Sequence, residues 1–188
     1  MIVPLAAAPW IVAQRASDFL RIVCAEYARL VARDYAEMAP YLPERAGTIL
    51  DVGCGVGGID VLLKRRYPDA ALLLLDGDGP AEMVPGFHEA YRPYNSRAVT
   101  DELLAANGVV GATWLDVGTT EVLRADLVVS LLSWGFHYPI STYRIAGPAT
   151  IVCDVRRAHR SDAEAAFGVP HAVLRSEPKY LRCAWRVR

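Results

Sequence analysis

The chain has 188 residues, of which 53% are hydrophobic, and its mean hydropathy is +0.20. This composition predicts one globular domain and excludes a disordered chain. The formal net charge of −1 at pH 7 argues against a dedicated nucleic-acid binder, which would carry a basic excess. We therefore expect a small-molecule substrate rather than a nucleic acid, and a homodimer stays an open alternative.

The four cysteines lie far apart, without a Cys-x-x-Cys pair or clustered histidines. This spacing predicts no metal site and is typical of a reduced, cytoplasmic protein. The first twelve residues are apolar but lack the basic start of a signal peptide, because the first basic residue is Arg15. No stretch of the sequence is long and apolar enough for a transmembrane helix. We therefore predict a cytoplasmic location and no membrane association.

Helical and strand patterns alternate along the chain. Residues 13–38 carry an amphipathic helical pattern, which Pro40 and Pro43 end. A strand, a turn and a helix follow within residues 48–67, and a second apolar strand at residues 71–75 ends in Asp76. Later patterns predict helices at residues 96–106, 140–145 and 161–167, strands at 111–115, 126–131 and 150–155, and a terminal hairpin of 169–175 with 180–187.

This alternation predicts an α/β fold. We expect a Rossmann-like, doubly wound, mostly parallel sheet with helices on both faces and a C-terminal antiparallel hairpin. Residues 127–132 are apolar without alternation, as a strand buried on both faces requires. Residues 1–188 should form a single domain, with an N-terminal helical segment at 1–44, a cofactor-binding core at 45–155 and C-terminal strands at 156–188.

The glycine-rich turn after the first strand is the strongest functional signal. Gly53, Gly55 and Gly58 satisfy the pattern Gly-x-Gly-x-x-Gly, which in dinucleotide-binding proteins places a pyrophosphate at the start of the next helix. Asp51 argues against that ligand, because a carboxylate repels a pyrophosphate and attracts an ammonium or sulfonium group. Asp76 follows the turn by about 20 residues, where nucleotide-binding α/β units hold a ribose diol.

Residues 49–57, Ile-Leu-Asp-Val-Gly-Cys-Gly-Val-Gly, resemble motif I of the class I S-adenosylmethionine-dependent methyltransferases. Asp76, the Trp-Leu-Asp run at 114–116 and the strand at 125–130 are similar to later parts of that family in order and rough spacing. The resemblance covers roughly residues 45–155, and it implies S-adenosyl-L-methionine as the cofactor.

The resemblance also implies roles for single residues. Asp51 and the glycine backbone would hold the methionine portion of the cofactor. Asp76, rather than its rival Asp78, would accept the ribose hydroxyls, and Asp116 would face the adenine amino group. Leu131 and Leu132 would pass near the sulfonium. The full implied set of cofactor-binding residues is Asp51, Gly53, Cys54, Gly55, Asp76, Gly77, Asp116, Val117 and Leu131.

An aromatic loop follows the strand at 126–131, at the edge where parallel sheets bind their ligands. It carries Trp134, Phe136 and Tyr138 around His137. We interpret the aromatic residues as the walls of a substrate pocket and His137 as a general base, since histidine titrates near neutral pH. The alternative is that they pack beneath the loop. Asp154, at the end of the next strand, is a second candidate acid or base.

These residues predict methyl transfer to a small-molecule acceptor, at a hydroxyl of a sugar or natural product. The loop lacks the Asn/Asp-Pro-Pro-Tyr/Phe motif of enzymes that methylate amino groups of nucleic-acid bases, and no acidic cluster for Mg²⁺ can be assembled. A cofactor-binding protein without catalysis and an NAD-dependent oxidoreductase are the alternatives. The N-terminal helix and residues 77–95 are expected to form a lid.

Overall fold

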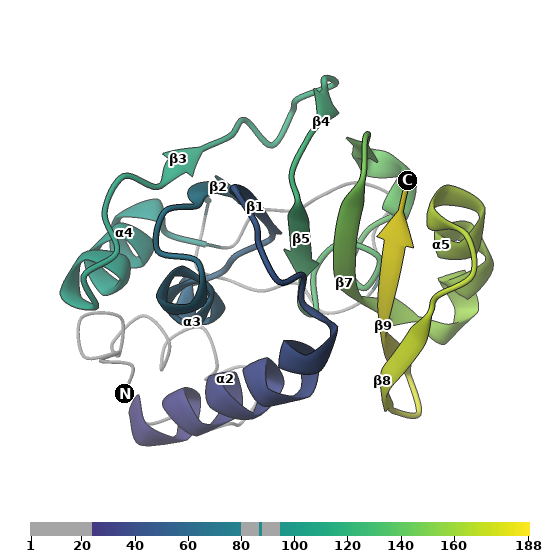
Figure 1. The fold of residues 1–188 in the computed structure, drawn as a ribbon, viewed down its shortest axis with the longest axis horizontal. Helices are drawn as coiled ribbons and strands as arrows, with labels where there is room; N and C mark the ends of the chain where they lie inside the picture. Colours follow the sequence, from purple (N-terminus) through teal and green to yellow (C-terminus); the bar gives the residue numbers. More distant parts are fainter. Residues whose placement is uncertain (1–23, 80–86, 88–94) are drawn as a thin grey trace.

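The computed structural model describes residues 24–79, 87 and 95–188 (Figure 1). Its centre is a seven-stranded sheet in the order β3-β2-β1-β5-β7-β9-β8, in which β3 to β7 are parallel and β9 and β8 are antiparallel. The predicted fold class is confirmed. The strands are β1 (Thr48–Val52), β2 (Ala71–Leu75), β3 (Thr113–Trp114), β5 (Leu127–Ser130), β7 (Ala149–Arg156), β8 (Ala172–Ser176) and β9 (Tyr180–Val187), and a separate pair joins β4 (Val122–Leu123) to β6 (Arg144–Ile145).

Helices cover both faces of the sheet, and two apolar clusters lie beneath them. Helices α2 (Cys24–Met38), α3 (Gly58–Arg66) and α4 (Arg97–Ala106) share one cluster with alternate strand residues such as Ile49. Helix α5 (Arg160–Phe167) shares the other cluster with residues such as Leu50. Burying each such side chain contributes about 1.5–3 kcal/mol, so the two clusters are the main source of stability. Within the described residues, no helix could cross a membrane.

Local differences from the predicted elements have physical causes. The strand predicted at 111–115 is shortened to Thr113–Trp114, because Gly111 has a φ of +75°. The helix predicted at 140–145 is wrong. Residues 140–142 form a single 3₁₀ turn and the chain then pairs with β4 as strand β6. Residues 13–23 of the predicted first helix and most of the predicted lid at 77–95 lie outside the described residues.

The carboxyl ends of the parallel strands meet at one edge of the sheet. In the strand register Val52 lies beside Leu75, and Ser130 lies beside Cys153. The segments that follow β1, β2 and β5 therefore leave the sheet together. Because β9 is antiparallel to β7, Tyr180 pairs with Arg156 and the β8–β9 turn reaches the same edge. This edge is where ligands of open α/β sheets bind.

Candidate functional site

The glycine turn after β1 is held in place by groups from three other parts of the chain. The Gly53 N–H donates to the Leu75 carbonyl at 2.7 Å, and the Gly55 N–H donates to Oδ2 of Asp76 at 2.8 Å. The Gly55 carbonyl lies 2.7 Å from both the Asn95 side-chain nitrogen and the Thr100 hydroxyl. The turn therefore keeps one fixed shape against the end of β2 and the start of α4.

Glycine is required at Gly53 for two reasons. Its φ is +78°, a region that side chains disfavour. A Cβ there would lie 1.7 Å from Oγ of Ser133, in the loop after β5. The absence of a side chain lets the turn and the β5 exit loop pack directly against one another.

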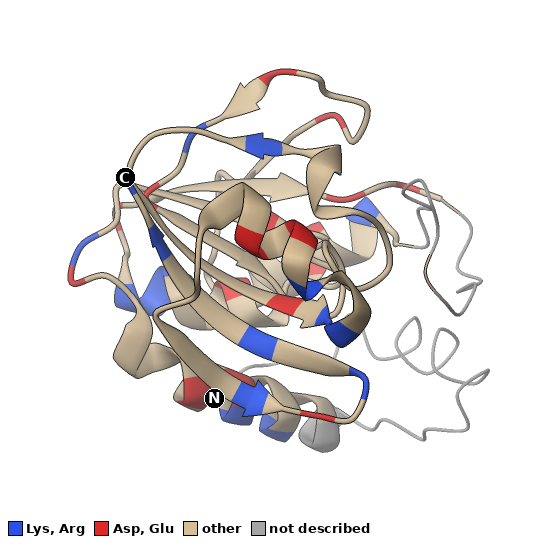
Figure 2. Cartoon of the chain, turned by 90° about the vertical axis from the view of Figure 1, so that its right-hand side faces the viewer, with Lys and Arg blue, Asp and Glu red and all other residues tan. Residues whose placement is uncertain are grey.

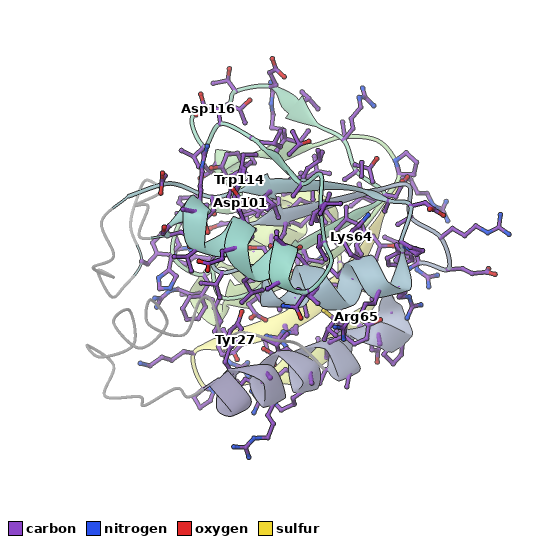
Figure 3. The ribbon with its side chains drawn as sticks, turned by 90° about the vertical axis from the view of Figure 1, so that its left-hand side faces the viewer. Tyr27, Lys64, Arg65, Asp101, Trp114 and Asp116 are labelled. Atoms are coloured by element: carbon purple, nitrogen blue, oxygen red, sulfur yellow. The ribbon has the colours of Figure 1, made fainter. Side chains whose placement is uncertain are left out.

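The start of α3 is covered by Tyr27 of α2, which Figure 3 shows below α3 in its view. The Gly58 N–H, at the first position of α3, donates to the Tyr27 hydroxyl at 3.1 Å. A Cβ on Gly58 would lie 2.2 Å from that hydroxyl oxygen. Burial raises the pKa of Tyr27, so the hydroxyl stays neutral. Tyr27 thereby occupies one of the free N–H groups at the helix start, which would otherwise attract an anion.

Two buried carboxylates lie next to each other behind the turn. Asp51 at the end of β1 is 2% exposed, and Asp60 in the first turn of α3 is fully buried. Neither oxygen of Asp60 accepts a hydrogen bond of good geometry from the described residues, and the polar groups nearest to it are the Asp51 carboxyl and its own backbone N–H. Burial and the neighbouring charge of Asp60 raise the pKa of Asp51 well above its usual range, and burial raises the pKa of Asp60 to about 7. A bound proton or a cation would therefore stabilise the pair.

The residues after β2 complete this side of the site. Both oxygens of Asp76 accept backbone N–H groups, from Gly55 and from Gly77, each at 2.8 Å. Asp78 instead accepts the N–H of Arg97 at 3.2 Å, at the start of α4. Asp76, the residue expected at the ribose, thus lies against the glycine turn, whereas its rival Asp78 lies at the start of α4. The Cys54 thiol lies 4.0 Å from Oδ2 of Asp76, and burial raises the pKa of Cys54, so it is a neutral thiol.

The loop after β3 carries the residues expected at the adenine. Asp116, labelled at the top of Figure 3, is exposed. Its Oδ1 accepts the Gly118 N–H at 2.8 Å. The Val117 carbonyl accepts the Tyr143 hydroxyl at 2.9 Å. Burial, followed by the charges of Asp76 and Asp116, raises the pKa of Tyr143 to about 12. Tyr143 therefore lies near the carboxylates that follow β2 and β3.

The exit loop after β5, residues 131–133, has an unusual backbone. Leu132 has a φ of +53° and is the single non-glycine residue with positive φ in the part of the chain that is described. Such a conformation costs about 1–2 kcal/mol. The Leu132 N–H donates to Oδ2 of Asp154 at 3.1 Å. Leu131, expected near the sulfonium, is partly buried and directly precedes this strained residue.

His137 and Phe136 lie on a tight turn beyond the exit loop. The N–H groups of both residues donate to the Ser133 carbonyl, at 2.7 Å for His137 and 3.0 Å for Phe136. The two rings meet edge to face at 4.8 Å, and both side chains are partly exposed. A shallow cavity of about 260 Å³ is lined by Phe136 together with residues 177–180, which include Lys179 and Tyr180. Phe136 thus borders a surface hollow at the expected ligand edge.

The two other aromatic residues of the loop point inward, which corrects their predicted role as pocket walls. Trp134 is fully buried, its indole N–H donates to the Ile140 carbonyl at 2.9 Å, and its ring packs on Phe167. Tyr138 is 2% exposed, and its hydroxyl lies 3.2 Å from Oγ of Ser133. Trp134 is a core residue, whereas Tyr138 supports the exit loop from beneath.

The structure also corrects the role of Asp154 as a catalytic acid or base. Its side chain is completely buried in β7, and its oxygens accept Nε and Nη2 of Arg182 at 2.7 and 2.9 Å. A carboxylate bound to a guanidinium on one side and to the Leu132 N–H on the other is not placed to exchange protons with a ligand. In the described part of the chain, no group of His, Cys, Asp and Glu side chains could hold a metal ion.

Sequence comparison finds short matches to ribosomal RNA methyltransferases. The chain is 38% identical over 66 residues to the ribosomal RNA small subunit methyltransferase C of Pseudomonas aeruginosa, covering 35% of this chain and 18% of the relative. It is 38% identical over 89 residues to the Escherichia coli protein of that name, covering 47% of this chain and 22% of the relative. The chain thus spans about a fifth of the length of these relatives. It matches no known protein-family profile.

Structure comparison extends over most of the chain. The N,N-8-amino-8-demethyl-D-riboflavin dimethyltransferase of Streptomyces davawensis has a TM-score of 0.58 at 12% identity, covering 87% of this chain and 56% of that one. The magnesium protoporphyrin IX methyltransferase of Synechocystis has a TM-score of 0.54 at 16% identity, covering 86% and 79%. This chain has the class I methyltransferase fold. The resemblance that motif I indicates is thereby confirmed for the methyltransferase fold.

Several residues of this methyltransferase fold were not predicted from the sequence. Asp60 has the pattern of an ordinary acid in a first helical turn, and only the glycine pattern beside it hints at burial. Tyr27, Asn95 and Thr100 act on the turn from distant positions, 31, 40 and 45 residues away. Arg97 donates to the carbonyls of both Asp76 and Leu115, at 3.0 and 3.3 Å, and so ties β2 to β3.

Proposed function

We propose that this protein transfers a methyl group from S-adenosyl-L-methionine to a hydroxyl of a small-molecule acceptor. The observation that carries the proposal is the buried pair Asp51 and Asp60, which lies behind the glycine turn and in which Asp60 accepts no hydrogen bond of good geometry from the described residues. An ammonium group is the natural partner of such a pair, because it supplies both positive charge and hydrogen-bond donors. A pyrophosphate would be repelled there.

The surrounding residues fit the rest of that cofactor. Asp51 and the Gly53–Gly55 backbone would hold its methionine portion, and Asp76 its ribose hydroxyls. Asp116 would face the adenine, and Leu131 would lie against the sulfonium. The bound cofactor would supply an electrophilic methyl group, so the protein mainly has to orient the acceptor. Orientation of this kind contributes up to about 7–11 kcal/mol in favourable cases.

The acceptor side of the proposal rests on the turn after β5. Phe136 packs edge to face against Tyr180 at 5.5 Å, beside the 260 Å³ cavity. A hollow of this size suits part of a small molecule. His137 is on the same turn, and we assign it the role of general base that removes the acceptor proton. The acceptor proton would go to the imidazole as the methyl group is transferred to the oxygen.

The first test is cofactor choice. We expect S-adenosylmethionine and S-adenosylhomocysteine, but not NAD(H), to raise the melting temperature of the purified chain. Saturation at 100 times the dissociation constant should add about 2.7 kcal/mol to the free energy of unfolding. Stabilisation by NAD(H) alone would show an oxidoreductase. Binding of S-adenosylhomocysteine without methylation of any compound in a broad panel would show a cofactor-binding protein without catalysis.

A second candidate acceptor is RNA, and two observations favour it. The curated relatives matched by the chain are ribosomal RNA methyltransferases. In addition, the Arg156 guanidinium lies over the rings of Phe136 and Phe87, at 4.8 and 5.9 Å, and such aromatic and arginine surfaces stack with bases. Parallel assays with labelled S-adenosylmethionine should include ribosomal RNA and a small-molecule panel. Incorporation of label into RNA alone would replace the hydroxyl acceptor by a nucleic-acid one.

A further inference from the structure

A buried ion network connects three parts of the chain that are distant in sequence. Its centre is Arg182 of β9, which is fully buried and pairs across the sheet with Asp154 of β7. Nη1 of Arg182 lies 3.1 Å from Asp34 and 3.5 Å from Glu37, both on α2. Figure 2 shows α2, which carries acidic and basic residues, running beside β8, whose charged residue is Arg175.

Arg175 of β8 serves as the outer part of the same network. Its Nη2 contacts Asp34 at 2.6 Å and Glu37 at 2.7 Å. It therefore ties α2 to the hairpin as Arg182 does. The other guanidinium nitrogen of Arg175, Nη1, donates to the Tyr180 hydroxyl at 3.4 Å. Within the described residues no hydrogen bond or ion pair joins Arg175 to Asp154, so Arg175 provides a control that leaves the inner end of the network intact.

The inner end of the network reaches the exit loop. Oδ2 of Asp154 accepts both Nη2 of Arg182 and the N–H of Leu132. A buried ion pair is weak evidence for stability, because well-packed apolar residues often replace one at no cost. What an apolar pair could not provide is a fixed acceptor for the N–H of a residue with a φ of +53°. Burial raises the pKa of Asp154, and the charge of Arg182 opposes that rise and holds the acceptor in place inside the sheet.

The exit loop is in turn packed against the glycine turn. Ser133, the next residue, fills the space where a Cβ of Gly53 would lie, 1.7 Å from its Oγ. A shift of Leu132 would therefore move the surface that faces the cofactor. We propose that Asp154 and Arg182 are positioning residues of methyl transfer, which set the conformation of residues 131–133. This inference rests on the proposed function for its cofactor, but its structural claim can be tested separately.

The decisive comparison uses two double variants of the full chain. Asp154→Leu with Arg182→Met removes both buried charges and the acceptor for Leu132. Asp154→Asn with Arg182→Met removes the same charges but keeps a side-chain oxygen for the Leu132 N–H. We expect the leucine variant to lose hydrogen-exchange protection at the Leu132 amide and S-adenosylhomocysteine affinity, each by about tenfold or more, as for loss of one buried hydrogen bond. The asparagine variant should stay within about threefold of the wild type.

Arg175→Gln is the matched control. It should leave both readouts within about twofold, since it cuts the α2 tether and the 3.4 Å contact with the Tyr180 hydroxyl but leaves Asp154 and Arg182 in place. Equal behaviour of the two double variants, or an Arg175→Gln effect as large as that of the leucine variant, would overturn the proposal. If the leucine variant does not fold, exchange in the wild type decides: an unprotected Leu132 amide contradicts positioning, and a protected one supports it. A wild type that does not bind S-adenosylhomocysteine refutes the proposed cofactor, while the amide measurement still tests the loop.

Discussion

Asp60 is the residue whose chemistry differs most from its appearance in the sequence. An acid at the start of a helix normally faces water, and its negative charge stabilises the helix by interacting with the positive end of the helix dipole. Here it is buried against Asp51, and its pKa is raised to about 7 by loss of solvent. The pair must therefore release a proton before it can hold an ammonium group with both charges. In the proposed binding mode, cofactor affinity would therefore depend on pH through this contact. Tyr27, Cys54 and Asp76 are the other titratable groups nearby.

The sign of the effect on stability follows from the raised pKa. Between about pH 4 and pH 7 the folded chain holds a proton on Asp60 that the unfolded chain has lost, so the Asp60 contribution to stability falls as the pH rises through that range. One such group changes the free energy of unfolding by up to about 1.4 kcal/mol per pH unit. Asp60→Asn should flatten this slope in urea unfolding at pH 5 to 8. The exposed change Asp69→Asn should keep the wild-type slope, and equal slopes in all three proteins would contradict the assignment.

His137 is the residue on which catalysis is proposed to depend. General-base catalysis contributes about 10²–10⁴-fold to rate, so His137→Ala should lower turnover of the acceptor by that factor. The affinity of the His137→Ala variant for S-adenosylhomocysteine should stay unchanged, because the proposal places the His137 side chain against the acceptor and not against the cofactor. Turnover is measured with whichever acceptor the methylation assays identify. The control variant is His171→Ala, at the residue directly before β8. A similar loss of turnover in both variants would argue against a base at position 137.

At the scale of single elements, the glycine turn and helix α4 act as one unit. Thr100 is fully buried in α4 and contacts the Gly55 carbonyl, while Asp76 binds the N–H of the same residue. Helix α4 thus helps to fix the turn that would bind the cofactor. Asn95, just before α4, adds to this coupling, because its side-chain nitrogen also contacts the Gly55 carbonyl.

Thr100→Val tests this coupling with almost no change of shape. Removing the hydroxyl leaves the Gly55 carbonyl with one partner fewer, and we expect a loss of about 1–2 kcal/mol in the free energy of unfolding. S-adenosylhomocysteine affinity should fall by about threefold to tenfold, since a loosened turn must be ordered again on binding. Calorimetric titration and urea unfolding measure the two effects. Thr100→Ser keeps the hydroxyl, so a serine variant as impaired as the valine variant would rule out the hydrogen bond as the cause.

At the scale of the whole molecule, strand patterns carried most of the fold prediction. Apolar runs such as residues 71–75 and 127–132 are typical of buried parallel strands. The structure places 71–75 in β2 and 127–130 in β5, and the end of the second run turns into the exit loop. The pair β4–β6 was missed because its strands have two residues each, too few to form a pattern. Trp134 was misread for a different reason: an aromatic residue after a strand can turn inward or outward, and only the packing on Phe167 decides.

The candidate site was predictable where one local segment determines it. The glycine turn and the acids at strand ends follow from the order of strand, turn and helix. Contacts that depend on tertiary structure could not be predicted. Tyr27 and Gly58, or Asp154 and Leu132, meet only because distant elements pack together. The burial of Asp60 belongs to the same class, since the helix pattern does not say which first-turn acid faces the sheet.

The ion network has a consequence for the order in which this chain can fold. Asp34 and Glu37 leave the ribosome early, yet their partner Arg175 follows 141 and 138 residues later. Contacts of such high sequence separation form late, because a long loop must be closed first. Before β8 and β9 form, Asp34 and Glu37 lack their partners Arg175 and Arg182. These ion pairs cannot then hold the C-terminal part of α2 against the sheet. The last two strands therefore complete the fastening of α2, whose Val31 and Met38 pack in the apolar core. A chain cut before these strands would lack the ion pairs that Asp34 and Glu37 make with Arg175 and Arg182.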